Sequence, residues 1–278
     1  MKRLLSIEFQ KIWKNRASRV LTITYFVLLT FIALIASIKF NIGNFKLHLA
    51  EVGIFNFPYI WHFNTYVADF FKFFLAVVIV SMMANEYSYG TLKQNLIDGI
   101  SKEEFIKSKF LTVLAFAAAS TVFIFVLSIV LGLCFSSYKE PGIIFSDMEY
   151  LIAYFVKLVG FFSFCLFIGI LIKRSAFAIG FVLIWYVVEG VILYWIILRR
   201  FFSQQTSDAI SQFFPLTSLS NLIVEPFTRL SPVKTMQGQV GMATDKDYSV
   251  HFWPILIVLV WTVIFVLMSY KLLKKRDL

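Results

Sequence analysis

The sequence is poor in charged residues and in cysteine, and each shortage excludes a class of protein. Only 15% of its residues are charged, against roughly 25% in soluble domains, whereas 59% are hydrophobic. The two cysteines, Cys134 and Cys165, both lie inside apolar runs, so neither a disulfide framework nor a CxxC-type metal site is expected. This composition indicates an integral membrane protein.

Several catalytic motifs are also missing. The sequence has no G-x-x-x-x-G-K-[ST] phosphate loop and no soluble segment large enough to hold one, so ATP hydrolysis must belong to another chain. HExxH and G-x-S-x-G are absent, which argues against an intramembrane hydrolase. The histidines, His48, His62 and His251, lack the spacing of a metal site. We therefore expect no catalytic residue, no metal and no cofactor in this chain.

Six apolar segments are long enough to cross a membrane, which takes about 20 residues in a helix. The first is too long for the apolar core of a signal peptide and no A-x-A-like site follows it, so we expect it to remain as a helix. The sequence thus predicts an all-α membrane protein in which residues 1–278 form one transmembrane domain. The expected spans are residues 20–40, 66–84, 111–135, 151–172, 176–198 and 252–272.

The second span contains two charged residues near its start, Asp69 and Lys72. Their i, i+3 spacing places both on one face of a helix, where they can partly neutralise one another near the outer boundary of the membrane. A tilted or interfacial start of this helix is the alternative.

Lysine and arginine residues cluster beside alternate ends of the six spans. They precede the first span, occupy residues 85–110, follow the fourth span at Lys173 and Arg174, and recur at the end of the sequence. Because cytoplasmic loops carry an excess of Lys and Arg, these regions and both termini are expected in the cytoplasm. The formal net charge of +10 is then explained by topology and gives little support to nucleic-acid binding.

Two segments outside the spans also show helical patterns. Residues 1–19 carry apolar residues at helical spacing from Leu5 to Trp13, which predicts an amphipathic helix along the cytoplasmic interface. A plain positively charged flank is the alternative. In the outer loop, residues 199–251, leucines at helical spacing follow Pro215, so we expect short amphipathic helices that dip into the outer leaflet.

Residues 85–110, NEYSYGTLKQNLIDGISKEEFIKSKF, are a polar segment between the second and third spans. A run of helix formers ends at the turn signal Asp98-Gly99, and Ser101 with Glu104 three residues later reads as a capping box. The pattern predicts a helix, a tight turn and a second helix on the cytoplasmic face. Such an element can dock a cytosolic partner, although a purely structural connection fits the same pattern.

This segment resembles the signature E-x-x-x-G-T-L-[KR] … S-[RK]-x-x-[FY]-x-x-x-K of ABC-2 type transporter permeases. The resemblance is carried by EYSYGTLK, from Glu86 to Lys93, and by SKEEFIKSK, from Ser101 to Lys109, and it extends to the layout of spans and short helices. In that family the segment is a coupling helix, which sits in a cleft of a separate ATP-binding subunit. Lys102 stands where Arg is frequent, which keeps the charge but loses bidentate geometry.

The resemblance implies the permease subunit of an ATP-driven transporter in a bacterial cell membrane. Aromatic-rich spans and the expected outer helices favour export of an amphipathic, peptide, drug or lipid-like substrate, and ion extrusion is also compatible with the family. The resemblance also implies a cytosolic ABC ATP-binding subunit that holds ATP and Mg, and a homodimer or a heterodimer with a second permease. A secondary transporter, for which no inverted repeat with broken helices is visible, and an intramembrane enzyme are the alternatives. The implied coupling residues are Glu86, Tyr87, Gly90, Thr91, Leu92, Lys93, Ser101, Lys102, Glu104 and Lys109.

Two charged residues, Lys157 and Glu189, lie within the fourth and fifth spans at similar depth below the outer helix ends. Because intramembrane charges are costly and face a protein interior or a cavity, we expect an ion pair that lines or braces the transport path. A purely structural pair, or a Lys157 side chain that extends to the interface, is the alternative.

Overall fold

The computed structural model describes residues 2–38, 40–42, 45–47, 53–230, 233–234 and 246–276. His48 lies outside the described residues. Within them, the chain is helical apart from a short antiparallel hairpin of β1 (Phe40–Ile42) and β2 (Phe45–Leu47).

Except where residues 38–58 and 230–251 intervene, the helices follow one another with short connections. They are α1 (Lys2–Lys14), α2 (Arg16–Ser37), α3 (Tyr59–Phe70), α4 (Lys72–Ser88), α5 (Thr91–Ile97), α6 (Lys102–Phe135), α7 (Pro141–Ile144), α8 (Glu149–Ile172), α9 (Ser175–Val187), the π-helical segment η1 (Val188–Leu198), α10 (Arg199–Phe201), α11 (Gln204–Ser211), α12 (Pro215–Ser220), the 3-10 turn η2 (Phe227–Arg229) and α14 (Phe252–Lys275).

Five helical stretches in the described part are long and apolar enough to cross a membrane, and α3 with α4 makes a sixth if the two count as one span. This agrees with a multi-pass helical membrane protein. The second expected span, residues 66–84, differs in detail: it begins earlier, at Tyr59, and bends by 46° where α3 meets α4. The apolar run after the bend is too short to cross alone, so α3 supplies the other half.

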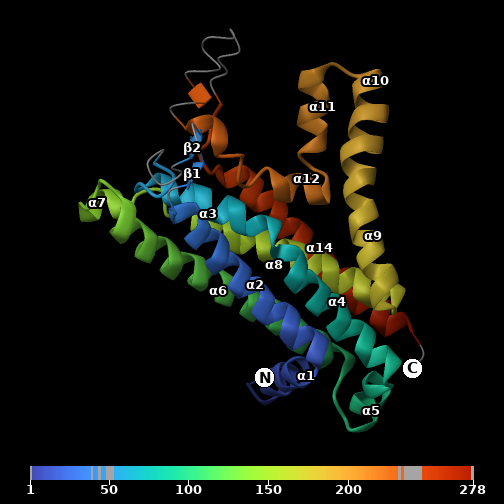
Figure 1. The fold of residues 1–278 in the computed structure, drawn as a ribbon. Coiled ribbons are helices and arrows are strands. Elements are labelled where there is room, and N and C mark those ends of the chain that lie inside the picture. The colour runs from blue at the N-terminus through green and yellow to red at the C-terminus, as the bar shows by residue number, and fades with distance from the viewer. Residues whose placement is uncertain are drawn as a thin grey trace.

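The two ends of the bundle carry different elements (Figure 1). One end holds α1, α5 and the last turns of α14, and we call it the termini end. The opposite end holds the β hairpin, α7, α10 and the start of α11. An even number of spans brings the two termini to the same side of a membrane. The placement of α1 and the last turns of α14 at one end agrees with this expectation.

Helix α8 forms the centre of the bundle. It packs against α4, α6 and α14, and 78% of its span is buried, against 17% of the α2 span and 17% of the α9–α10 span. Apart from Lys157, apolar residues occupy all sides of this helix, as expected for a helix enclosed by others. Gly160 allows the closest approach, because a Cβ there would lie 2.8 Å from Leu219 of α12 and 2.9 Å from Val258 of α14.

The helix–turn–helix between the second and third spans is confirmed. Ser101 caps α6 by accepting from the backbone N–H of Glu104 at 3.1 Å, and the Glu104 carboxylate accepts from the backbone N–H of Ser101 at 3.0 Å. Helix α6 then continues without a break as the third span. The first helix is shorter than expected, because α4 extends to Ser88 and Gly90 separates it from α5.

The amphipathic helix at the N-terminus and the short helices after the fifth span are also present. In α1, Ile12 is buried while Phe9 and Trp13 remain exposed, as suits a helix with one side on the bundle and one toward lipid. Helix α12 begins at Pro215 and buries Leu216 against the bundle.

Gly90 provides the first test, because it holds a left-handed conformation with φ of 67° and no neighbouring atom within 4 Å of an added Cβ. Gly90→Ala should therefore lower the free energy of unfolding by about 1 kcal/mol through backbone strain alone. Gly90→Asn should lose less, since Asn tolerates this region. Thermal unfolding in detergent measures both.

Gly180 is the matched control, because it also has open space around its Cβ position but lies inside helix α9. Gly180→Ala should be neutral or stabilising, by up to about 1 kcal/mol. Equal losses at the two glycines would contradict the strained junction.

Candidate coupling site

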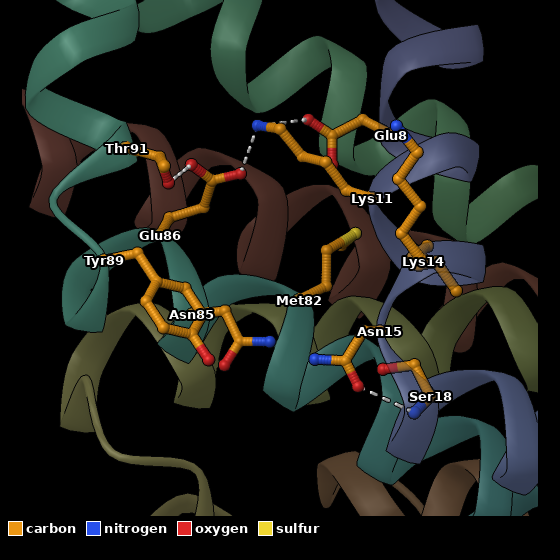
Figure 2. A pocket seen from close by; sticks show the side chains of 11 residues that line it. Glu8, Lys11, Lys14, Asn15, Ser18, Met82, Asn85, Glu86, Tyr89 and Thr91 are labelled. Atoms are coloured by element: carbon orange, nitrogen blue, oxygen red, sulfur yellow. Dashed lines mark hydrogen bonds and ion pairs between the residues drawn. The ribbon is translucent and has the colours of Figure 1, made fainter.

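Glu86 lies in the last turn of α4, and its carboxylate is buried against three other helices. It accepts hydrogen bonds from Lys11 of α1 at 2.9 Å, from Lys109 of α6 at 2.6 Å and from the Thr91 hydroxyl at the start of α5. Only 2% of Glu86 is exposed. Figure 2 shows the Lys11 and Thr91 contacts from the two sides of the carboxylate. One side chain therefore joins α1, α4, α5 and α6.

A second carboxylate completes this cluster. Glu8 of α1 accepts from Lys109 Nζ at 2.6 Å, and its other oxygen lies 3.8 Å from Lys11 Nζ. Lys109 is fully buried between the two carboxylates. We call Glu8, Lys11, Glu86 and Lys109 the Glu86 network. Its two negative and two positive charges balance, which a buried cluster requires.

The local sequence explains why these four residues meet. Glu8 and Lys11 are spaced i, i+3 on α1 and so share the face that packs on α6. Gly90 interrupts the helical conformation after α4. The chain changes direction there, so that Thr91 at the start of α5 reaches Glu86. The spacing of Glu8 and Lys11 could have suggested a shared face, but nothing in the sequence indicated that this face meets Lys109.

The remaining predicted coupling residues separate into a buried and an exposed group. Both Leu92 and Lys93 belong to α5; the Leu92 side chain is buried, while the Lys93 side chain is exposed. Tyr87 and Lys102 hold the end of α14: the Tyr87 hydroxyl accepts from Arg276 at 3.0 Å, and Lys102 donates to the Arg276 carbonyl at 2.9 Å. Lys102, which the family resemblance assigned to coupling, therefore makes a contact within this chain. Ser101 and Glu104 form the exposed capping box.

Two exposed apolar residues beside this segment were not predicted from the sequence. Tyr89 is 73% exposed and Ile97 is 69% exposed, on either side of Lys93 along the chain. We call Tyr89, Lys93 and Ile97 the α5 surface. Tyr89 is the C-cap residue of α4 and Ile97 ends α5, and both are exposed at the termini end, where an aromatic side chain of this kind is typical of protein interfaces.

The expected pair of Lys157 and Glu189 is wrong, because each finds another partner. Lys157 Nζ lies 3.1 Å from Asp69 Oδ2, and Lys72 Nζ lies 2.8 Å from the same oxygen, so one carboxylate serves two lysines. The expected pairing of Asp69 with Lys72 is confirmed. Similar depth along two spans did not fix which faces of the helices meet.

Glu189 instead caps a helix. Its carboxylate accepts from the backbone N–H groups of Leu216 at 2.9 Å and Thr217 at 3.0 Å, and from the indole of Trp185 at 2.6 Å. The first N–H groups of a helix have no partner within it, so a carboxylate at the start of α12 is favourable. Glu189 thereby ties η1 to α12.

The fold and these sites define a multi-pass helical membrane protein with a charged junction at its termini end. Residues 27–278 match the family described as protein of unknown function DUF2705, and the chain belongs to that family. The matched region contains Glu86 and Lys109 but starts after Glu8 and Lys11.

A shorter similarity links the chain to one curated protein. A stretch of 79 residues, 27% of the chain, is 32% identical to the uncharacterized protein YhcI of Bacillus subtilis (strain 168). This match covers 25% of YhcI, which is well under two thirds of its length.

The Glu86 network predicts a large difference between two lysines of α6. Lys109→Met leaves Glu8 without its close partner and Glu86 with one lysine, so the free energy of unfolding should fall by about 3–5 kcal/mol. Lys107→Met removes an exposed pair with Glu103 that water and salt screen, so it should lower the free energy of unfolding far less than Lys109→Met. Denaturant or thermal unfolding in detergent compares the two variants, and equal losses would contradict a buried network.

The corrected partners of Lys157 can be tested by double-mutant cycles. Lys157→Met and Asp69→Asn should be non-additive, with a coupling of about 0.5–3 kcal/mol in the free energy of unfolding. Lys157→Met and Glu189→Gln share no partner and should add within about 0.5 kcal/mol. A coupling between Lys157 and Glu189 larger than that with Asp69 would restore the original pairing.

Proposed function

We propose that this chain is the membrane-spanning subunit of an ATP-driven transporter and works with a separate ATP-hydrolysing subunit. The observation that carries the proposal is the attachment of α5. This helix presents an exposed surface to the outside of the bundle and is fastened to three other helices through the buried carboxylate of Glu86. The proposal places the termini end in the cytoplasm of a bacterial cell, where that subunit would bind.

The α5 surface supports docking of such a subunit. Tyr89 and Ile97 are each more than two-thirds exposed, and Lys93 between them adds a positive charge. The surface lies beside the capped start of α6, so its backbone is ordered on both sides by the Gly90 junction and the Ser101 cap. A rigid apolar anchor with a charged neighbour is a common composition of a protein interface.

The Glu86 network supports transmission of a movement from that surface. A push on α5 acts on Thr91 and Glu86, and Glu86 is held by Lys11 and Lys109. Because both lysines sit on long helical elements, α1 and α6 must follow the end of α4 or the buried charges lose their partners. The cost of separating them, about 3–5 kcal/mol, favours movement of these helices together.

Six spans resemble half of a transport path, so the proposal includes a second permease, either the same chain or a related one. Helix α9 and η1 suit contact with it, because 17% of that span is buried within the single chain. The proposed cargo is an amphipathic or lipid-like molecule, and the proposed direction is export. In this scheme ATP and Mg are bound by the partner subunit alone.

A secondary transporter is the second candidate, favoured by the bent span. The junction of α3 and α4 at Phe71 carries Asp69 and Lys72, with Lys157 opposite. Broken helices with charged groups inside the membrane are typical of ion-coupled transporters. Such a protein would transport without a nucleotide-hydrolysing partner, so one experiment separates the two candidates.

The proposed function is tested by purifying the tagged chain from its native host in mild detergent. A subunit with a phosphate loop and Mg-dependent ATP hydrolysis should remain bound. Lys93→Glu with Ile97→Asp should weaken this association by about 2 kcal/mol, because both changes remove interface contacts from exposed positions. Retained ATP hydrolysis per permease measures the effect.

Lys271→Glu is the matched control, since Lys271 is exposed near the same end of the bundle but lies on α14. It should retain the ATP-hydrolysing subunit, and all variants should keep the unfolding temperature of the parent chain. Transport by proteoliposomes that contain this chain alone, with no ATP present, would instead establish the secondary transporter.

A further inference from the structure

A pocket of about 290 Å³ opens beside the Glu86 network at the termini end. Its walls come from α1, the start of α2, the end of α4 and the start of α5, so it lies where two pairs of helices change direction (Figure 2). These helix junctions are at Asn15 and Gly90. Tyr89 of the α5 surface is one of the residues that line the pocket, but docking on that surface leaves the rest of the pocket unexplained.

Two side-chain amides face one another across the pocket. The Asn15 oxygen accepts from the backbone N–H of Ser18 at 3.0 Å, which caps α2 and turns the Asn15 amide nitrogen away from that helix. Figure 2 shows this nitrogen and that of Asn85 pointing toward each other. Two N–H donors that face across a space are satisfied by an acceptor placed between them.

The charges around the pocket favour a negative ligand. Glu8 and Glu86 line it, but both are neutralised within the Glu86 network. Lys14 also lines it, is exposed, and has no ion-pair partner among the described residues. The pocket therefore combines a balanced cluster with one additional positive charge and two amide donors.

Apolar side chains occupy the remaining wall and the adjoining surface. Ile12 and Met82 line the pocket and are buried, while Trp13 and Val20, which are near lining residues along the chain, are 55% and 52% exposed. A ligand with a charged oxygen-rich head and an apolar body matches both parts. The pocket lies at the ends of the spanning helices, which is the depth of lipid headgroups.

We propose that this pocket binds the phosphate-bearing headgroup of an anionic phospholipid from the adjacent leaflet. The phosphate oxygens accept hydrogen bonds from Asn15 and Asn85 and pair with Lys14, while the acyl chains extend along Trp13 and Val20. The bound headgroup bridges α1 and the α4–α5 junction. This inference goes beyond the proposed function and does not depend on it.

Native mass spectrometry of the delipidated full chain tests the proposal with phosphatidylglycerol as the probe. One phosphatidylglycerol molecule should bind more tightly than any further copies and more tightly than phosphatidylcholine. Lys14→Glu and Asn85→Leu should each weaken this first binding event at least about tenfold, since each removes a hydrogen-bond donor to a charged oxygen. Equal binding of the two lipids would overturn the preference for an anionic headgroup.

Arg19→Glu is the matched control, because Arg19 is an exposed cation on the next turn of α2 and does not line the pocket. It should change the first binding event less than about twofold. A loss equal to that of Lys14→Glu would reduce the effect to general surface charge and overturn the site. Equal binding of sn-glycerol 3-phosphate, measured by calorimetry, would assign the pocket to a soluble phosphate and overturn the lipid. These outcomes leave the test of ATP-driven transport unaffected.

Discussion

The buried carboxylate of Glu86 sets the arrangement of helices at the termini end. An ionised carboxylate in an apolar surrounding must be matched by positive charge and hydrogen-bond donors, and here these come from α1, α5 and α6. Lys109 must in turn be matched, which fixes Glu8 and with it the rotation of α1. The packing of Phe9 of α1 against Phe116 of α6, with ring centroids 5.9 Å apart, follows from the same rotation.

A second cluster of charges acts at the other end of α4. Asp69 and Lys72 lie on either side of the bend at Phe71, and Lys157 reaches them from the central helix α8. Helix α4 is therefore anchored by ion pairs at both ends, and its 17 residues span about 25 Å. Under the proposed function, displacement of its Glu86 end is transmitted along this uninterrupted helix to the bend.

Sequence patterns predicted the features that depend on neighbours in the chain. The capping box of Ser101, the start of α12 at Pro215 and the pair of Asp69 with Lys72 each need contacts only a few residues apart. The six expected spans followed from apolar length, and the described residues contain five helical stretches of that kind, or six with the bent pair α3 and α4. The location of the coupling segment within the chain was also predicted, but its docking role stays a proposal.

Contacts between distant segments could not be predicted in the same way. Lys11 appeared only as a positive charge before the first span and Lys109 as one of the implied coupling residues, and no pattern in the sequence indicated that the two meet on Glu86. For Lys157 and Glu189, the sequence indicated a similar depth in the membrane. Whether the two side chains meet also depends on how each helix is rotated about its axis. The rotation follows from packing of the whole bundle, which periodicity in a nearly uniform apolar helix does not reveal.

The contacts of Glu189 show how the rotation of the α9–η1 span matters for the proposed function. Because the Glu189 carboxylate holds the first N–H groups of α12, the span formed by α9 and η1 is fastened to the bundle by a polar contact in the half that lies farther from the termini end. Little of this span is otherwise buried, so apolar packing within one chain contributes less to its position than to that of α8. A helix held at a few points and exposed along its length changes its tilt at lower cost than an enclosed one. The α2 span is equally little buried, but it contains no carboxylate that could make such an attachment, so in the proposed transporter the α9–η1 span is the one that would move relative to α4, α6 and α8 on contact with a second permease.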